Sequence, residues 1–176
     1  MTRRVTRAVL SLGSNLGDRL ARLRQAVAGF AAELELASPV YETAPWGGVP
    51  QDDFLNAVII VRSAELDAWD WLRRGQELEQ AAGRVREVHW GPRTLDVDVV
   101  AVFDTSPADT VAVLSEHPDL LLPHPGAAER NTVLRPWLDI EPDAVLPGRG
   151  RVDELLAGLG EDGMRRRDDL SLLEPV

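Results

Sequence analysis

Hydrophobic residues recur along the chain at two spacings, one typical of strands and one typical of helices. Short apolar stretches predict four strands, at about residues 7–14, 34–43, 54–62 and 94–103. Apolar residues at helical spacing predict two long helices, at about 17–33 and 66–83. The apolar side of the second helix is expected to be formed by Leu66, Trp69, Leu72, Leu78 and Ala82.

This order of elements indicates the class of fold. Strand, helix, strand, strand, helix, strand is the split βαβ pattern of ferredoxin-like α+β sandwiches. We therefore expect an antiparallel sheet with helices packed on one face, and with the other face and its loops left open for a ligand. Residues 44–53 hold two prolines and two glycines, which predict a mobile loop.

The rest of the chain predicts less regular structure. The acidic segment 104–119 is expected to be irregular, and short helices are expected at 130–138 and 152–159. A chain of 176 residues fits one domain, 1–176, with one hydrophobic core. At its end we expect a flexible tail at 163–176, in which Arg165 to Asp169 form a solvated face.

Composition and charge exclude several functions. A formal net charge of −10 disfavours nucleic acid as a partner, because phosphate neutralisation supplies most of that affinity. No stretch approaches the ~18 apolar residues of a membrane helix, and no signal segment is evident, so we expect a cytoplasmic protein without a membrane partner. All 19 basic residues are arginine, which excludes a P-loop lysine. Phosphate would have to be bound by arginine and metal.

The strongest chemical signal is the motif Trp90-Gly91-Pro92-Arg93-Thr94-Leu95-Asp96-Val97-Asp98. Asp96 and Asp98 are two apart in a predicted strand, so their carboxylates point to the same face. Adjacent carboxylates repel unless a cation lies between them, and this pattern suits Mg²⁺, which usually takes one or two carboxylates plus water and phosphate. The alternative is a solvated pair, or carboxylates held by arginine.

Arginines gather just before this pair. Arg84, Arg86 and Arg93 lie within ten residues of each other, which suggests a polyphosphate clamp built from guanidinium groups. The alternative is a surface loop whose arginines pair with nearby glutamates. A third basic element is His124 with Arg130, although a loop histidine is more often structural than a ligand.

Six blocks in this order resemble successive signatures of the hydroxymethyldihydropterin pyrophosphokinase family. They cover residues 11–19, 41–47, 54–57, 83–86, 90–98 and 123–130, within a resemblance that spans about 8–147. The resemblance implies a ferredoxin-like fold, two Mg²⁺ ions bound by Asp96 and Asp98, and ATP as the donor. It also implies transfer of the β,γ-pyrophosphoryl group to the hydroxymethyl oxygen of 6-hydroxymethyl-7,8-dihydropterin in folate biosynthesis, with release of AMP.

The resemblance also implies roles for individual residues. Those implied to be catalytic are Arg84, Arg93, Asp96 and Asp98. Those implied to bind ATP are Gln76, Glu79, Arg84, Arg86, Trp90, Arg93, His124 and Arg130. Those implied to bind the pterin are Thr43, Pro45, Trp46, Phe54, Asn56 and Asp96. Phe54 and Asn56 are two apart on a predicted strand and can face one site, whereas taken alone they are an ordinary core aromatic and a turn residue.

The sequence departs from the family pattern at a few positions. Ala44 stands where proline is frequent, and His89 where arginine is frequent. Thr132 stands where the family usually has a phenylalanine that completes the aromatic sandwich around the pterin. Affinity for the pterin is then expected to be weaker, unless Trp46 or Trp137 covers the open side instead.

Two rival functions follow from the same residues. A nucleotidyl transferase could use paired aspartates and arginines, but it would leave the AMP moiety on its acceptor. A non-catalytic nucleotide- or pterin-binding module is the second rival, and the presence of Asp96, Asp98, Arg84 and Arg93 argues against it. We expect a monomer, and association with other folate-pathway enzymes is left open.

Overall fold

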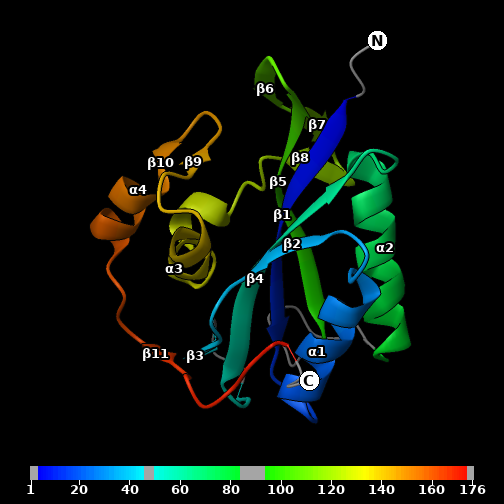
Figure 1. Cartoon of the computed structure of the whole chain (residues 1–176). Helices are drawn as coiled ribbons and strands as arrows, with labels where there is room; N and C mark the ends of the chain where they lie inside the picture. Colours follow the sequence, from blue (N-terminus) through cyan, green and yellow to red (C-terminus); the bar gives the residue numbers. More distant parts are fainter. Residues whose placement is uncertain (1–3, 46–49, 84–93, 174–176) are drawn as a thin grey trace.

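The computed structural model describes residues 4–45, 50–83 and 94–173. The elements are, in chain order, β1 (Val5–Ser14), α1 (Arg19–Gly29), β2 (Leu34–Ala37), β3 (Tyr41–Thr43), β4 (Phe54–Ser63), α2 (Ala68–Ala81), β5 (Asp96–Ser106), β6 (Asp109–Ala112), β7 (Ser115–His117), β8 (Leu120–Leu122), the 3-10 turn η1 (Ala127–Glu129), α3 (Asn131–Ile140), β9 (Val145–Leu146), β10 (Gly150–Arg151), α4 (Val152–Leu159) and β11 (Met164–Arg166). Figure 1 shows a central sheet with α1 and α2 on one side, and α3 and α4 on the other.

The main sheet of the described residues has seven strands, and every pairing in it is antiparallel. Its order is β11-β3-β4-β1-β5-β6, and β2 pairs with the same strand, β4, as β3 does. Strands β1 to β5 and helices α1 and α2 therefore form two interleaved βαβ units. The predicted ferredoxin-like α+β fold is confirmed.

The first core lies between the sheet and helices α1 and α2. Leu10 and Leu12 of β1 and Ile59 of β4 point to this side, where they meet Phe30 and Trp71. All five side chains are fully buried. Both long helices thus pack against the apolar side chains on one face of the inner strands.

A second core lies on the opposite face, so the prediction of helices on one face alone is wrong. Val9 of β1 and Val58 and Ile60 of β4 project to this side, where Leu134 and Trp137 of α3 cover them. The inner strands are apolar on both faces over much of their length, and apolar surface on both faces has to be covered. In the described part of the chain, the end of this face beyond α3 is what remains for a ligand.

The predicted strand 34–43 is two strands with a break at Ser38-Pro39-Val40. Proline has no amide hydrogen to donate to a ladder. At the break, Ser38 donates its backbone N–H to the carbonyl of Val58 (2.9 Å), and its hydroxyl accepts from the Val58 N–H (2.9 Å). The Ser38 hydroxyl therefore takes the place of one backbone acceptor in the ladder. Beyond the break, β3 pairs with β4, the strand with which β2 also pairs.

Both long helices are shorter than predicted at both ends, and side-chain caps set where they begin. Asp18 accepts from the N–H of Ala21, so α1 begins after Asp18, and Asp67 forms a capping box with Asp70 at the start of α2. On α2 the buried side includes Trp71, whereas Trp69, which was predicted to face the core, is 39% exposed. In the described part of the chain, no helix has the length and apolarity needed to cross a membrane.

Two predictions for the second half of the chain need correction. The segment 104–119 is not irregular: β5 extends to Ser106 and forms a hairpin with β6, and β7 follows. Near the end of the chain, β11 pairs with β3, and Leu172 is buried in the first core. The solvated face predicted for Arg165 to Asp169 is confirmed for the four exposed residues and wrong for Arg167, which is half-buried. Arg165 and Arg167 both bond Glu42. The short helices predicted near 130–138 and 152–159 are confirmed as α3 and α4.

We expect the two tryptophans of α2 to differ in their contribution to stability. Trp71→Ala should lower the free energy of unfolding by about 3–5 kcal/mol, because it empties a fully buried site. Trp69→Ala, the matched control, should cost about 1 kcal/mol, because Trp69 is partly exposed and loses mainly its edge contact with His117. Urea denaturation of both variants measures the difference, and equal losses would contradict the packing of α2.

The single tyrosine of the chain reports on the docking of α3. Tyr41 of β3 donates its hydroxyl to the Asp139 carboxylate of α3 (2.5 Å), and burial together with this hydrogen bond raises its pKa to about 12. Ultraviolet titration should therefore detect phenolate only near pH 12. Asp139→Asn should move the titration to lower pH, because it removes the neighbouring negative charge. Identical titration curves for the two proteins would contradict this contact.

Candidate active site

Three adjacent strands bring predicted site residues together on the uncovered end of the second face. Gly13 of β1 lies opposite Asn56 of β4 on one side and opposite Asp96 of β5 on the other. Ser11, two residues back along β1, lies opposite Asp98. Because opposed residues of an antiparallel ladder project to the same face, Asn56, Asp96 and Asp98 share one surface, as the sequence predicted for the aspartate pair.

Gly13 keeps this surface free of side chains. A Cβ atom at this position would stand 3.1 Å from Oδ1 of Asn56 and 3.7 Å from Cδ1 of Phe54. The bottom of the space between the Asn56 amide and the Asp96 carboxylate is therefore formed by the Gly13 backbone alone. Gly13 lies inside the predicted strand 7–14, and a glycine within a strand is the sequence signal of a close approach by a ligand or another backbone.

Thr43 fixes the orientation of the Asn56 amide. The Nδ2 group of Asn56 donates to Oγ1 of Thr43 (2.7 Å), whose residue is buried on β3 directly opposite Phe54. With Nδ2 held by Thr43, Oδ1 is the amide atom that lies toward Gly13. We call Gly13, Thr43, Asn56 and Asp96 the sheet floor. A flat heterocycle lying on it would meet an amide at one edge and a carboxylate at the other.

A cavity of about 260 Å³ lies at the neighbouring edge of β5. This edge is open because β6 pairs only with the far part of β5, from Phe103 to Ser106. The cavity is lined by Gln76 and Glu79 of α2, by Asp98, and by His124, so four predicted residues from three separate parts of the chain meet there. Gly75 lets α2 approach closely, because a Cβ at Gly75 would stand 2.9 Å from Cγ1 of Val97.

His124 is held in a defined orientation beside Asp98 and Arg130. Its backbone N–H donates to the carbonyl of Val100 (2.8 Å), and its Nδ1 accepts from the N–H of Gly126 (3.1 Å). Burial lowers the pKa of His124, and the positive charge of Arg130 lowers it too, while Asp98 raises it. The imidazole is therefore neutral at pH 7 and carries its proton on Nε2, the nitrogen that remains available to donate.

Asp96 belongs to the sheet floor and Asp98 lines this cavity, so the acidic pair lies where the two meet. Among residues 4–45, 50–83 and 94–173 there is no group of three or more side chains that could hold a metal ion. Asp96 and Asp98 alone fit the small carboxylate share that Mg²⁺ usually takes from protein when phosphate and water complete its shell. The donor set thus suits a metal that arrives with a nucleotide, rather than a closed structural metal site.

For the other predicted residues, the structure gives a position in the fold but no contact within the site, or they lie outside the described residues. Pro45 is half-buried at the end of the described segment 4–45, and Arg130 lies just before α3. Thr132 is half-buried in the first turn of α3, two residues after Arg130. Five predicted residues, and His89, lie outside the described residues: Trp46, Arg84, Arg86, Trp90 and Arg93.

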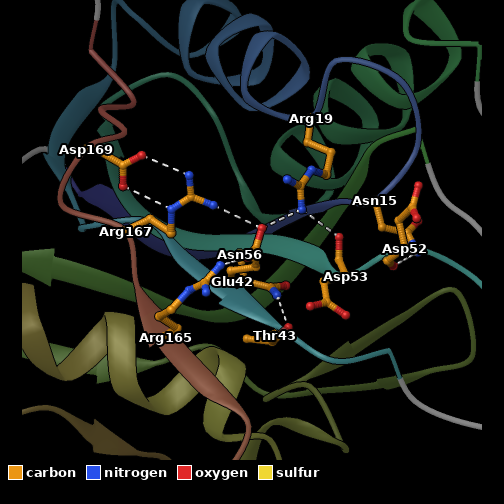
Figure 2. A network of polar contacts seen from close by, with 10 residues as sticks. All are labelled: Asn15, Arg19, Glu42, Thr43, Asp52, Asp53, Asn56, Arg165, Arg167 and Asp169. Atoms are coloured by element: carbon orange, nitrogen blue, oxygen red, sulfur yellow. Dashed lines mark hydrogen bonds and ion pairs between the residues drawn. The ribbon is translucent and has the colours of Figure 1, made fainter.

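A polar network that the sequence did not reveal borders the sheet floor (Figure 2). Asn15 donates Nδ2 to the carbonyl of Asp52 (2.9 Å) and to Oε1 of Gln51 (2.7 Å). Arg19 donates Nη1 to the carbonyl of Asp53 (2.9 Å) and to the Glu42 carboxylate (2.8 Å). The chain that enters β4 is therefore held by Asn15, just after β1, and by Arg19, the first residue of α1. Asn15 and Arg19 belong to the first sequence block, which was the only signal for them.

Comparisons with known proteins show the family of this chain. Residues 9–142 match the family model described as 7,8-dihydro-6-hydroxymethylpterin-pyrophosphokinase (HPPK). A 2-amino-4-hydroxy-6-hydroxymethyldihydropteridine pyrophosphokinase of Mycobacterium tuberculosis is 48% identical over 172 residues, covering 97% of this chain and 92% of the relative. The enzyme of the same name from Bacillus subtilis is 39% identical over 137 residues, covering 76% of this chain and 77% of the relative. The chain belongs to the 7,8-dihydro-6-hydroxymethylpterin-pyrophosphokinase family.

Solved structures support the fold. An HPPK-DHPS crystal structure in complex with substrates aligns with a TM-score of 0.65 at 12% identity, covering 94% of this chain and 47% of that one. Wild-type Plasmodium falciparum HPPK-DHPS gives a TM-score of 0.63 at 11% identity, covering 92% and 48%. This chain thus spans about half the length of those structures, and at such low identity the similarity concerns the fold.

Proposed function

We propose that this chain transfers the pyrophosphoryl group of ATP to 6-hydroxymethyl-7,8-dihydropterin, in folate biosynthesis, and releases AMP. Family membership supports the reaction class. The observation that carries the proposal for this chain is that β5 places Asp96 and Asp98 between the sheet floor and a cavity lined by Gln76, Glu79 and His124. The proposal includes a cytoplasmic enzyme that acts as a monomer, with association with other folate-pathway enzymes as the alternative.

The sheet floor is the proposed pterin side of the site. Asn56 would bind the polar edge of the ring through Oδ1, since its Nδ2 is held by Thr43. Phe54, which lies opposite Thr43, offers an aromatic side chain for contact with the ring. Pro45 and Trp46 complete the proposed pterin set, and Asp96 would face the hydroxymethyl end.

The cavity beside β5 is the proposed nucleotide side. Gln76 and Glu79 of α2 and the neutral His124 would bind ATP there by donating and accepting hydrogen bonds. Arg130, whose guanidinium lies against Gly126 near His124, would contribute a positive charge. Four further residues complete the proposed ATP set, and all are outside the described residues: Arg84, Arg86, Trp90 and Arg93.

The proposed chemistry depends on position and charge neutralisation. The hydroxymethyl oxygen of the pterin forms a bond to the β-phosphorus and loses its proton to water, while the bond from that phosphorus to the oxygen bridging the α-phosphate breaks, so AMP leaves. Two Mg²⁺ ions bound by Asp96 and Asp98 would neutralise phosphate charge. Arg84 and Arg93 would steady the reacting phosphates, because guanidinium groups bind phosphate oxygens through paired donors. The other side chains bind and orient the two substrates.

The decisive experiment is incubation of the chain with ATP, Mg²⁺ and the pterin, followed by separation of the products. AMP and a pterin diphosphate are the expected products. A nucleotidyl transferase would release pyrophosphate and leave the AMP moiety on the acceptor, and a binding module would leave ATP unchanged. Either of these results would replace the proposal.

Replacement of either aspartate should remove activity without loss of stability. Asp96→Ala and Asp98→Ala should each lower AMP production by roughly a hundredfold or more, because each deletes a proposed Mg²⁺ ligand. Stability should hold or rise, because carboxylate repulsion is relieved. Asp104→Ala is the matched control, since Asp104 lies on the same strand, opposite Thr6 and away from the cavity. Near-normal AMP production by either variant would contradict the metal assignment.

The residue at Thr132 should affect pterin affinity rather than the chemical step. Thr132→Phe should lower the KM for the pterin several-fold, because an aromatic pair is worth about 0.5–1.5 kcal/mol beyond burial. The kcat value should stay constant, because such a contact is equal in the ground and transition states. Thr132→Leu adds bulk without a π-face and is the control.

The structure removes one of the two substitutes proposed for the missing aromatic. Trp137 is fully buried in the second core, and its Nε1 donates to the Glu141 carboxylate (3.1 Å). It therefore does not swing toward the pterin. Trp46 remains the alternative, and if it covers the ring, Thr132→Phe should overfill the site and raise the KM. An unchanged KM in both variants would mean that Thr132 does not line the site.

A further inference from the structure

Glu42 of β3 is the meeting point of three arginines from distant parts of the chain (Figure 2). Arg19 of α1 donates Nη1 to Oε2 of Glu42 at 2.8 Å, and Arg167 donates Nη1 to the same oxygen at 3.1 Å. Arg165 of β11 bonds the other oxygen, Oε1. The Glu42 side chain is only 11% exposed, so this carboxylate is largely removed from water and stays there because it is matched by positive charge.

The charge state of Glu42 follows from these contacts. Burial raises the pKa of the carboxyl group, but the hydrogen bond from Arg19 and the positive charges of Arg165 and Arg167 outweigh burial, so the pKa is lowered. Glu42 is therefore ionised at neutral pH. One further carboxylate balances the cluster, since Asp169 accepts two hydrogen bonds from Arg167 (3.0 and 2.8 Å).

The end of the chain is fastened to β3 by backbone as well as by side chains. Met164, Arg165 and Arg166 pair with Thr43, Glu42 and Tyr41, respectively. The N–H of Arg167 then donates to the carbonyl of Val40 at 2.8 Å. Beyond Arg167, Leu170 and Leu172 pack into the first core. The segment from Met164 to Leu172 is thus held along its length.

Glu42 is also joined directly to the sheet floor. It precedes Thr43, whose hydroxyl accepts from Asn56, on a strand of only three residues. Through Arg19, the Glu42 carboxylate is connected to the carbonyl of Asp53, the residue just before β4. Glu42 and its arginines therefore hold the two stretches of chain that carry Thr43 and Asn56 of the sheet floor. These stretches are β3 and the first residues of β4.

We infer that Glu42 is a positioning residue for the pterin and that the C-terminal segment from Met164 to Asp169 acts on the site through it. The inference rests on the proposed function, because it assigns the sheet floor to the pterin. Glu42 does not touch the substrate: its side chain lies on the other face of β3 from Thr43, since neighbouring strand residues project to opposite faces. It holds β3 against β4, so that the Thr43 hydroxyl keeps the Asn56 amide in the binding orientation.

A purely structural role and a positioning role predict different measurements. Glu42 keeps two arginine partners when one is lost, and the arginines themselves are partly exposed, so loss of one arginine should leave the melting temperature nearly unchanged. A misplaced Asn56 amide weakens a hydrogen bond to the ring, so pterin binding should suffer while ATP binding does not. The chain also offers a matched control, because Arg166, between Arg165 and Arg167, bonds Asp168 and not Glu42.

The test measures steady-state kinetics for Glu42→Ala, Glu42→Gln, Arg167→Ala and the control Arg166→Ala. The KM for the pterin should rise about three- to tenfold in Glu42→Ala and Arg167→Ala, the effect of one lost hydrogen bond. The KM for ATP and the kcat should change by less than about twofold, because the nucleotide cavity is not touched. Glu42→Gln keeps an acceptor and should be intermediate, and Arg166→Ala should match the unmodified chain.

Three results would overturn the inference. These are an unchanged pterin KM in both Glu42→Ala and Arg167→Ala, an equal rise in Arg166→Ala, or a parallel loss of ATP affinity. Hydrogen exchange separates this failure from failure of the proposed function. If the unmodified chain makes no AMP, the proposed function is wrong, and the positioning role is then decided by the rate of amide hydrogen exchange at Tyr41 to Thr43. Glu42→Ala should raise that exchange rate. An unchanged exchange rate would overturn the role of Glu42.

Discussion

The two-sided pairing of β1 is the constraint on which the rest of the structure depends. β1 pairs with β4 along one edge and with β5 along the other, and its side chains are buried on both faces. Helices α1 and α2 cover one face, while α3 covers part of the other. The site occupies the end of β1 where apolar side chains give way to Gly13 and where the flanking strands carry Asn56 and Asp96 instead.

The same arrangement separates the two substrates that we propose. The sheet floor belongs to β1, β3, β4 and the start of β5, whereas the cavity belongs to α2, the open edge of β5 and the loop after β8. Asp96 and Asp98 lie on the boundary because alternate residues of a strand share a face. A phosphate group entering from the cavity therefore meets the carboxylate pair before it can reach a ligand on the sheet floor, which is the order that transfer requires.

Arginine provides positive charge throughout this acidic chain. All 19 basic side chains are arginine, and the described ones form ion pairs at several points of contact between distant segments. A planar guanidinium can satisfy two acceptors at once. Arg19 does so between Glu42 and Asp53, and Arg167 does so between Glu42 and Asp169. The edge of the sheet floor thus depends on shared donors rather than on apolar packing alone.

The sequence by itself determined the order of elements, the aspartate pair and the family, because these follow from local spacing and from contiguous motifs. Periodicity placed Asp96 and Asp98 on one face, and the six blocks indicated which residues would meet. The sequence could not show that α3 covers the second face of the sheet, because α3 and the strands that it covers are far apart in the chain.

The tertiary structure alone decided the contacts between distant segments. Trp71 rather than Trp69 faces the core because of the way α2 packs against the sheet, which the spacing of apolar residues along α2 did not decide. Glu42, Arg19 and Arg167 carry no motif that links them, and their ion pairs exist because the start of α1 and the chain at β11 both lie beside β3. Local patterns fix what each segment can form, whereas packing and charge neutralisation between segments fix where each one lies.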